Sequence, residues 1–333
     1  MTAGCLPPES SDHPAPREAP ALPDLPDDVE QQAPPEEPPV EPLPDPDPPV
    51  EQPPVDPPVE IDPVVVATFN VKRFFDTVCD SGRCTADDYE HVYAESEFEA
   101  KADLVAYGIE RLDADVVLLQ EVESVACLDA LKSRLADRYP VAVLGELGYA
   151  ASLDVAVLGR DRILATRRHA DHRIPLMNGG TTTFSREVLE VHLEVDGRRV
   201  IAIAAHFKAK NNDDPERRLA EGMAARQIIL DAAAAHPEAL VVFGGDLNDT
   251  PGSPPIDALE GDGDLLRVAS ELGDDAATYI WGDDAQAIDH IYLAQPASGD
   301  YVSGTAEVVR DGRGLARSDH AGLRATFALP PLD

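Results

Sequence analysis

The prolines of this 333-residue chain are unevenly distributed, and their distribution limits where a folded core can form. Of 31 prolines, 21 lie within residues 1–63, in a stretch made almost entirely of Pro, Asp, Glu, Val and Ala. That stretch has no aromatic residue and no helical or strand period, so burial could not offset the entropy lost on ordering it. We expect an extended acidic spacer over residues 1–63 and one folded domain over residues 64–333.

The chain is strongly acidic, with a formal net charge of −36. Residues 1–63 hold 16 acidic side chains against Arg17 alone, so the spacer carries −15 and the domain the remaining −21. A domain of this charge has no general attraction for a polyanion. Any phosphate that it binds must therefore be met by local arginines or by metal cations held on carboxylates; an acidic surface that serves only solubility is the alternative.

Within the domain, short β-branched runs alternate with amphipathic segments of helical period. Buried strands are expected at 64–69, 115–120, 154–160, 187–195, 199–207, 240–245, 288–293 and 321–328, and helices at 99–113, 125–138 and 214–235. Residues 70–98 are polar and irregular and are expected to form a long loop. The pair Asp196-Gly197 predicts a hairpin between two of the strands. This pattern favours an α/β fold in which two mixed sheets pack on each other with helices outside.

Several expected strands end in a polar residue that a hydrophobic core would not select. Asn70, Glu121, His206 and Asp246 each follow an apolar run directly. Each has an ordinary explanation by itself, such as a turn, a helix cap or a solvated carboxylate. If these strand ends converge, however, the gathered carboxylates require a cation, and an all-oxygen set suits Mg²⁺, Mn²⁺ or Ca²⁺ better than Zn²⁺.

The joint pattern resembles the endonuclease/exonuclease/phosphatase superfamily, whose members have a deoxyribonuclease I-like fold. The resemblance runs from about Val64 to Phe327 and is greatest to bacterial extracellular nuclease-type members. It implies a four-layer α/β/β/α sandwich and a metal-dependent phosphoric diester hydrolase, most simply an endonuclease. The matching blocks are ATFNVKRFFD at 67–76, DADVVLLQEVES at 113–124, SLDVAVLGR at 152–160, AHFKAK at 205–210, GGDLNDTPGSPP at 244–255, AIDHIYL at 287–293 and SDHAGLRATF at 318–327.

Carried over position by position, the resemblance implies metal ligands at Glu121, Asn70 and Asp319. Mg²⁺ is the expected ion, with Mn²⁺ and Ca²⁺ as alternatives. Arg160 and Arg186, at the end of one expected strand and the start of the next, are candidates for positioning a phosphate, with ordinary surface arginines as the alternative. The arginine-rich helix that carries Arg218 is expected to present a solvated face.

The resemblance also implies a catalytic set of two histidines and their partners. Its members are Asp246 to orient or deprotonate the attacking water, Asn248 to donate to a phosphate oxygen, His320 to stabilise the developing charge, Asp289 to fix the tautomer of His320, and His206 to approach the phosphate from the opposite side. The chain departs from the family pattern beside His206, where Ala205 and Ala209 replace an asparagine and a serine. These substitutions remove polar support for the histidine.

Two substrate classes and one non-catalytic role fit these residues. A nuclease acting on DNA or RNA fits the extracellular-type blocks, although an acidic domain offers few cationic contacts to a polyanion. A phosphodiesterase or phosphatase for lipid or small phosphorylated substrates needs fewer such contacts. A catalytically silent binding module should have lost metal or base residues, and the chain retains all of them. A monomer is expected.

The cysteines bear on localisation. Thr-Ala-Gly-Cys at 2–5 resembles the end of a bacterial lipoprotein signal, which predicts an exported protein with a lipid anchor at Cys5 if the natural start lies further upstream. Membrane contact is then expected only through that anchor. Cys79 and Cys84 could close a short disulfide loop in an oxidising compartment, and burial of the cysteines as small apolar residues is the alternative. The sequence does not fix a pairing among Cys79, Cys84 and Cys127.

Overall fold

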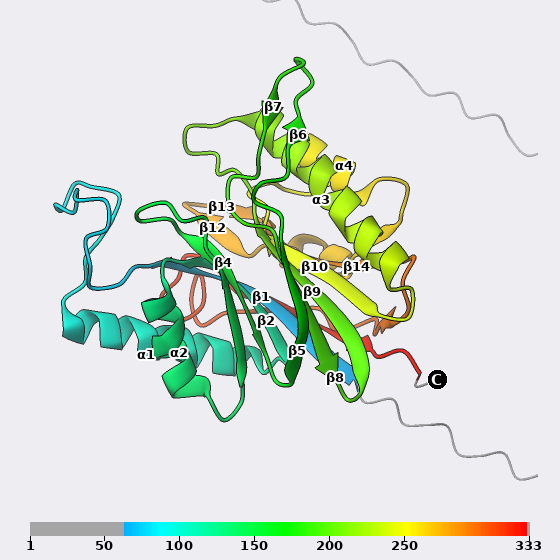
Figure 1. Ribbon diagram of the computed structural model, residues 1–333, viewed down its shortest axis with the longest axis horizontal. Helices are drawn as coiled ribbons and strands as arrows, with labels where there is room; N and C mark the ends of the chain where they lie inside the picture. Colours follow the sequence, from blue (N-terminus) through cyan, green and yellow to red (C-terminus); the bar gives the residue numbers. More distant parts are fainter. Residues whose placement is uncertain (1–62, 332–333) are drawn as a thin grey trace, which may run out of the picture. The chain divides into compact units, whose positions relative to one another are not determined.

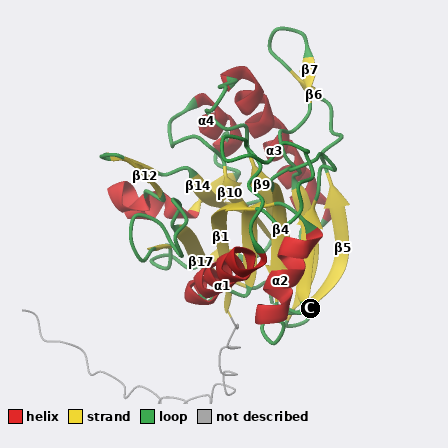
Figure 2. Cartoon of the chain, turned by 90° about the vertical axis from the view of Figure 1, so that its left-hand side faces the viewer, coloured by secondary structure: helices red, strands yellow, loops and turns green. Residues whose placement is uncertain are grey.

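A computed structural model describes residues 63–331 and contains two large β-sheets with helices on the two outer sides (Figures 1 and 2). The described part begins at Pro63, the first residue of strand β1. The predicted spacer before Pro63 and the predicted lipid anchor at Cys5 lie outside the described residues. The fold predicted from the sequence, two packed mixed sheets flanked by helices, is confirmed.

The first sheet has seven strands, in which β1 and β2 are parallel and the other pairs are antiparallel. Its order is β15 (Asp300–Tyr301), β17 (Gly322–Ala328), β1 (Pro63–Phe74), β2 (Val116–Val122), β4 (Asp154–Gly159) and β3 (Val141–Gly145), with β16 (Glu307–Val309) also on β17. Successive side chains of a strand point to opposite faces. In β1, Val64 and Val66 therefore face the second sheet, while Ala67 and Phe69 face the helices.

The second sheet has six strands, of which only β9 and β10 pair in parallel. Its order is β11 (Leu265–Arg267), β14 (Asp289–Ala294), β10 (Leu240–Asp246), β9 (Arg198–His206), β8 (Leu189–Val195) and β5 (Arg162–Arg168). Two small hairpins accompany the sheets, β6 (Ile174–Pro175) with β7 (Thr181–Thr182) and β12 (Tyr279–Trp281) with β13 (Asp284–Gln286). A shared apolar core fills the space between the two large sheets.

Helices cover the outer face of each sheet. On the first sheet lie α1 (Glu95–Leu112) and α2 (Val125–Leu135), and on the second lie α3 (Pro215–Ala235) and α4 (Pro254–Glu260). A 3₁₀ segment, η1 (Val268–Ala276), packs against β14 and β16. The start of α3 follows from its sequence, because Asp214 accepts the backbone N–H of Arg217 and Pro215 occupies the first turn. No helix within residues 63–331 has the length and apolarity needed to span a membrane.

The expected elements differ from the structure in a few places. Strand β1 continues to Phe74 beyond a break in register after Asn70, where the sequence predicted a loop. The sequence pattern also did not predict several short elements, namely β3, β5, β6, β7, β11, β12, β13, β15, β16, α4 and η1. The predicted hairpin turn is present, with φ of 48° at Asp196 and 75° at Gly197 between β8 and β9. Cys79 and Cys84 form a disulfide in the loop after β1, while Cys127 is buried as a free thiol.

Candidate active site

Three neighbouring strands of the second sheet bring polar side chains to one edge. Asp246 ends β10 and pairs in register with His206, the last residue of β9, and with Asp289, the first residue of β14. Gly245 permits this approach, because a Cβ at that position would lie 1.8 Å from the carbonyl oxygen of Ala205. The φ of Gly245 is 152°, a value that residues with a side chain rarely adopt. The Gly-Gly-Asp sequence thus sets Asp246 beside both neighbours.

Asp246 is the meeting point of the site and is only 2% exposed. Its Oδ2 accepts a hydrogen bond of 2.9 Å from Asn70 Nδ2, and its Oδ1 accepts one of 2.9 Å from the backbone N–H of Asn248. The Nε2 atoms of His206 and His320 lie 3.6 Å and 3.8 Å from the same Oδ2. Two histidines therefore face one carboxylate that the backbone and an amide hold in place.

Asp289 fixes the ring of His320. Its Oδ2 lies 2.8 Å from His320 Nδ1 and also accepts the hydroxyl of Thr278 at 2.6 Å. Ligand atoms of Asp246, Asp289 and His320 all lie within 4.8 Å of one another. Burial acts to lower the pKa of His320, but the carboxylates of Asp289 and Asp246 outweigh it and raise that pKa to about 10. A histidine that ligates a metal must be neutral, so these charges favour a protonated, hydrogen-bonded His320 over a metal ligand.

Asp246 and His206 also have shifted pKa values, but in their case burial sets the direction of the shift. Burial raises the pKa of Asp246 to about 7, with the nearby Asp289 acting in the same direction and His320 opposing it. The pKa of His206 is well below its usual value because the ring is buried and lies near the charges of Arg186 and His320. The Nδ1 atom of His206 is buried without a hydrogen-bond partner. This agrees with the loss of polar neighbours at Ala205 and Ala209.

The residues predicted as metal ligands lie on the opposite wall, at the end of the first sheet. Asn70 donates from Nδ2 to Glu121 Oε1 at 3.2 Å and accepts the backbone N–H of Lys72 at Oδ1. Its amide thus joins the carboxylates of Glu121 and Asp246. The metal-ligand role of Asn70 stays a prediction. Glu121 sits in the irregular part of β2 with φ of 67°, and its Oε2 accepts the backbone N–H of Arg73 at 2.7 Å.

Asp319 and Asn248 complete the predicted set. Asp319 Oδ2 forms an ion pair of 3.0 Å with Lys72 Nζ. Asn248 has φ of 54° and donates from Nδ2 to the carbonyl oxygen of Phe207 at 3.1 Å. Both residues line the same cleft as Glu121, His206, Asp246 and His320, a hollow of about 420 Å³. The structure therefore brings together every residue of the predicted metal and catalytic sets, with Asn70 and Asp289 buried directly behind the cleft wall.

The two candidate phosphate-binding arginines, Arg186 and Arg160, lie in different parts of the structure. Arg186 lines the cleft, and its Nη1 donates to the carbonyl oxygen of Phe207 at 3.3 Å. Arg160 follows β4, which runs antiparallel to β2, so Arg160 lies at the opposite end of the sheet from Glu121. There its Nη1 forms an ion pair of 2.6 Å with Asp115. The prediction that Arg160 contacts the same phosphate is wrong because a strand's direction decides which sheet edge its end reaches.

Positive side chains surround the cleft although the chain is acidic. Lys72, Arg73, Arg186 and Lys210 all line it. They come from β1, the loop before β8 and the loop after β9. Local cations thus lie where a phosphate would bind. The acidic composition of the chain predicted that local positive charge would be needed there.

Sequence reasoning missed several residues that support the site. Thr278 holds Asp289, and Tyr279 forms a β-bridge with His320, their ring centroids 4.9 Å apart. Arg218, expected on a solvated face, is 3% exposed and donates from Nε to Asp249 Oδ2 at 2.8 Å. Glu221 is fully buried and accepts the backbone N–H groups of Ser185 and Lys208. None of these supporting residues stands in a matching block. For Arg218 and Glu221, only their periodicity on α3 could have indicated burial.

The comparison with protein families agrees with this geometry. The model of the Endonuclease/Exonuclease/phosphatase family matches residues 67–320, which include every residue of the site. The chain belongs to this family. Members of the family are phosphoric diester hydrolases and generally depend on divalent metals. No match was found among curated proteins.

Solved structures share the fold of this family member at low sequence identity. A truncated TDP2 from Caenorhabditis elegans is 18% identical with a TM-score of 0.54, covering 80% of this chain and 97% of that one. The human Nocturnin catalytic domain with bound sulfate is 17% identical with a TM-score of 0.57, covering 80% and 94%. Sphingomyelinase C from Streptomyces griseocarneus is 20% identical with a TM-score of 0.55, covering 80% and 99%.

Proposed function

We propose that this chain is an exported, divalent-metal-dependent nuclease that hydrolyses phosphodiester bonds of DNA or RNA. The observation that carries the proposal is one cleft in which a buried carboxylate, Asp246, faces two histidines and is rimmed by cations. A phosphodiester is an anion, and it needs both a base for water and local positive charge. Export is supported by the Cys79–Cys84 disulfide, because such bonds persist in oxidising compartments.

The donor set on the cleft wall fits a hard cation. Glu121 and Asp319 are carboxylates that face the same hollow, and the ammonium of Lys72 already neutralises one of them. Oxygen ligands of this kind suit Mg²⁺, with Mn²⁺ and Ca²⁺ as alternatives. Glu121 and Asp319 would hold the ion, while Asn70 orients Glu121 through its amide. When bound, the ion supplies Lewis acidity and charge neutralisation at a phosphate oxygen.

The protein's own groups divide the remaining chemistry. With a pKa raised to about 7, Asp246 can take a proton from water near neutral pH, and Asn70 and Asn248 keep its oxygens in place. His320 carries a proton at neutral pH and stabilises negative charge on the phosphate. His206 is neutral and donates a hydrogen bond from the other side of the cleft. Arg186 and Lys210 position the phosphate.

A lipid or small phosphodiester is the second candidate substrate. Trp281 is 72% exposed at the end of β12, the strand whose Tyr279 lines the cleft. An exposed aromatic beside a phosphate site would also suit a lipid surface.

The test offers plasmid DNA, RNA, sphingomyelin and methyl p-nitrophenyl phosphate to the protein with Mg²⁺, with Ca²⁺ and with EDTA. We expect Mg²⁺-dependent cleavage of nucleic acid and of the small diester, and loss of both in EDTA. Activity that persists in EDTA would contradict the metal-dependent mechanism. Turnover of sphingomyelin without any cleavage of nucleic acid would select the second candidate.

A further inference from the structure

The loop between β1 and α1 carries an exposed aromatic side chain next to Arg73, a residue that lines the cleft. Tyr89 is 51% exposed, and the fully buried ring of Phe75 packs against it edge to face, with centroids 5.7 Å apart. The guanidinium carbon of Arg73 lies 5.2 Å from the centroid of the Tyr89 ring. The ring is therefore supported by an apolar residue and accompanied by a cation, while half of its side chain remains open to solvent.

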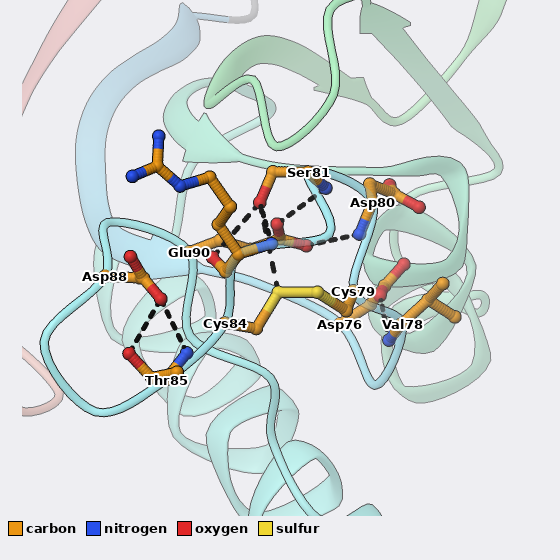
Figure 3. The surroundings of a disulfide bond; sticks show 10 residues. Asp76, Val78, Cys79, Asp80, Ser81, Cys84, Thr85, Asp88 and Glu90 are labelled. Carbon is orange, nitrogen blue, oxygen red and sulfur yellow. Dashed lines mark hydrogen bonds between the residues drawn. A yellow bond between two sulfur atoms is a disulfide. The ribbon is translucent and has the colours of Figure 1, made fainter.

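Both chain neighbours of Tyr89 are anchored by hydrogen bonds, Glu90 to the loop that the Cys79–Cys84 disulfide closes and Asp88 to Thr85, the residue after that loop (Figure 3). Glu90 is 1% exposed, and its two oxygens accept the backbone N–H groups of Asp80 and Ser81 at 2.6 and 2.8 Å. On the other side, Asp88 accepts the backbone N–H and the hydroxyl of Thr85. Tyr89 thus stands between two fixed residues, so its placement is settled by folding and little further ordering is needed on binding.

Arg73 connects Tyr89 to the catalytic residues. The backbone N–H of Arg73 binds Glu121, and Arg73 itself lines the cleft. In addition, the pKa of Tyr89 is raised, first by burial of its hydroxyl and then by the carboxylate of Glu121, while Arg186 and Arg73 oppose the shift. The Tyr89 ring therefore lies one residue away from the cleft, against a side chain that lines it.

The Tyr89 ring and the adjacent Arg73 favour an uncharged or anionic ligand over a cationic one. A choline headgroup binds aromatic faces through its positive charge, and Arg73 beside Tyr89 would repel it. A nucleobase is uncharged and stacks on an aromatic ring, while an arginine beside it contacts the adjoining phosphate. Bases in a duplex hide their faces, whereas unpaired bases expose them.

We propose that Tyr89, held by the disulfide-closed loop and flanked by Arg73, is a stacking platform for an unpaired nucleobase next to the scissile phosphate. Single-stranded nucleic acid is then the preferred substrate of this site. The proposal rests on the proposed nuclease function and names its substrate class.

The test measures binding without turnover. Fluorescence anisotropy in EDTA reports the Kd of a labelled single-stranded DNA, an RNA of the same sequence, an abasic strand of equal length and a duplex. The variants are Tyr89→Ala, Tyr89→Phe and, as a matched control, Tyr107→Ala, an exposed tyrosine on α1 whose hydroxyl accepts a hydrogen bond from Arg111 of the same helix. Thermal melting of each variant checks that it is folded.

We expect Tyr89→Ala to raise the Kd for base-bearing single strands about tenfold, the effect of losing one stacked base. Tyr89→Phe keeps the ring and should stay within about twofold of the wild type, as should Tyr107→Ala. The abasic strand and the duplex should bind the wild type and Tyr89→Ala equally. A loss of affinity in Tyr89→Ala for either DNA or RNA supports the platform and shows which of the two the site binds.

Equal binding of the base-bearing strand by folded Tyr89→Ala and the wild type would overturn the inference, as would an equal loss with the abasic strand. A wild type that binds no single strand at all would also overturn it. Hydrolysis of methyl p-nitrophenyl phosphate by the wild type with Mg²⁺ is measured separately. That substrate has no nucleobase to stack on Tyr89. If the wild type does not hydrolyse it, the proposed function is refuted. If the wild type hydrolyses it but the binding result is negative, only the stacking platform is refuted.

Discussion

Two clusters of histidine and carboxylate side chains lie on the same six-stranded sheet, and the first of them opens on the cleft of the candidate active site. The first, His206, Asp246, Asp289 and His320, gathers where β9, β10 and β14 meet the loop before β17. The second surrounds Glu190 on β8, which is 2% exposed. The residue types are alike, so residue type alone does not distinguish them.

The clusters differ in how completely their polar atoms are paired. Glu190 accepts Arg167 and His192 at Oε1 and contacts His169 at Oε2, and Arg199 donates to the remaining ring nitrogen of His192. In the cleft, by contrast, His206 Nδ1 and Asp289 Oδ1 have no hydrogen-bond partner. A fully paired cluster stabilises the fold, whereas buried unpaired polar atoms cost stability, a cost that is typical of functional sites.

The largest expected effect comes from Asp246→Asn, which keeps the shape of the side chain but removes the base. We expect kcat to fall by about 10²–10⁴, the usual contribution of a general base. The unfolding temperature should hold or rise, because the buried carboxylate is costly to desolvate. Steady-state kinetics on methyl p-nitrophenyl phosphate and a thermal melt check both. A variant with full activity would remove Asp246 from the mechanism.

The opposite outcome is expected for Glu190→Gln, which should lower stability and leave kcat within about twofold. Although burial opposes it, hydrogen bonds from His169 and His192 lower the pKa of Glu190 to about 2. A carboxyl with a lowered folded pKa stabilises the protein above its unfolded value of 4.5, so the loss at pH 7 is roughly 3 kcal/mol.

This contribution disappears as the pH falls from about 4.5 toward 2, and the stabilities of the variant and the wild type should then converge. Urea unfolding across that range measures the difference. Glu194→Gln is the matched control, because Glu194 lies on the same strand and pairs with the exposed Arg162. A pH-independent difference would refute the assignment of the loss to the Glu190 charge.

The smallest expected effect is a difference in KM between variants of the two candidate phosphate-binding arginines, Arg186 and Arg160. Arg186→Ala should raise KM for an oligonucleotide about tenfold, because it removes a charged donor from the cleft. Arg160→Ala should change KM by less than about twofold, since Arg160 pairs with Asp115 at the other sheet edge. Parallel kinetics of both variants test the comparison. Equal effects on KM would contradict the assignment of substrate contact to Arg186 alone.

The sequence by itself determined the two-sheet fold and most of the site. Strand runs, the Asp196-Gly197 turn and the helix start at Asp214 follow from local alternation and local hydrogen bonds, which need no distant partner. The matched blocks also located the predicted catalytic residues, and the Gly-Gly-Asp sequence carries its own reason for the close approach of two strands.

Only the tertiary structure decided which groups are paired. Arg160 and Arg186 look alike in sequence, yet the direction of β4 sends Arg160 to the opposite edge. The sequence around Arg218 predicts a surface residue, but in the structure Arg218 is buried and pairs with Asp249, which lies 31 positions away in the chain. Glu190 and Asp246 likewise acquire different roles from partners on other strands. Pairing depends on contacts between residues far apart in the chain, and local sequence patterns do not encode those contacts.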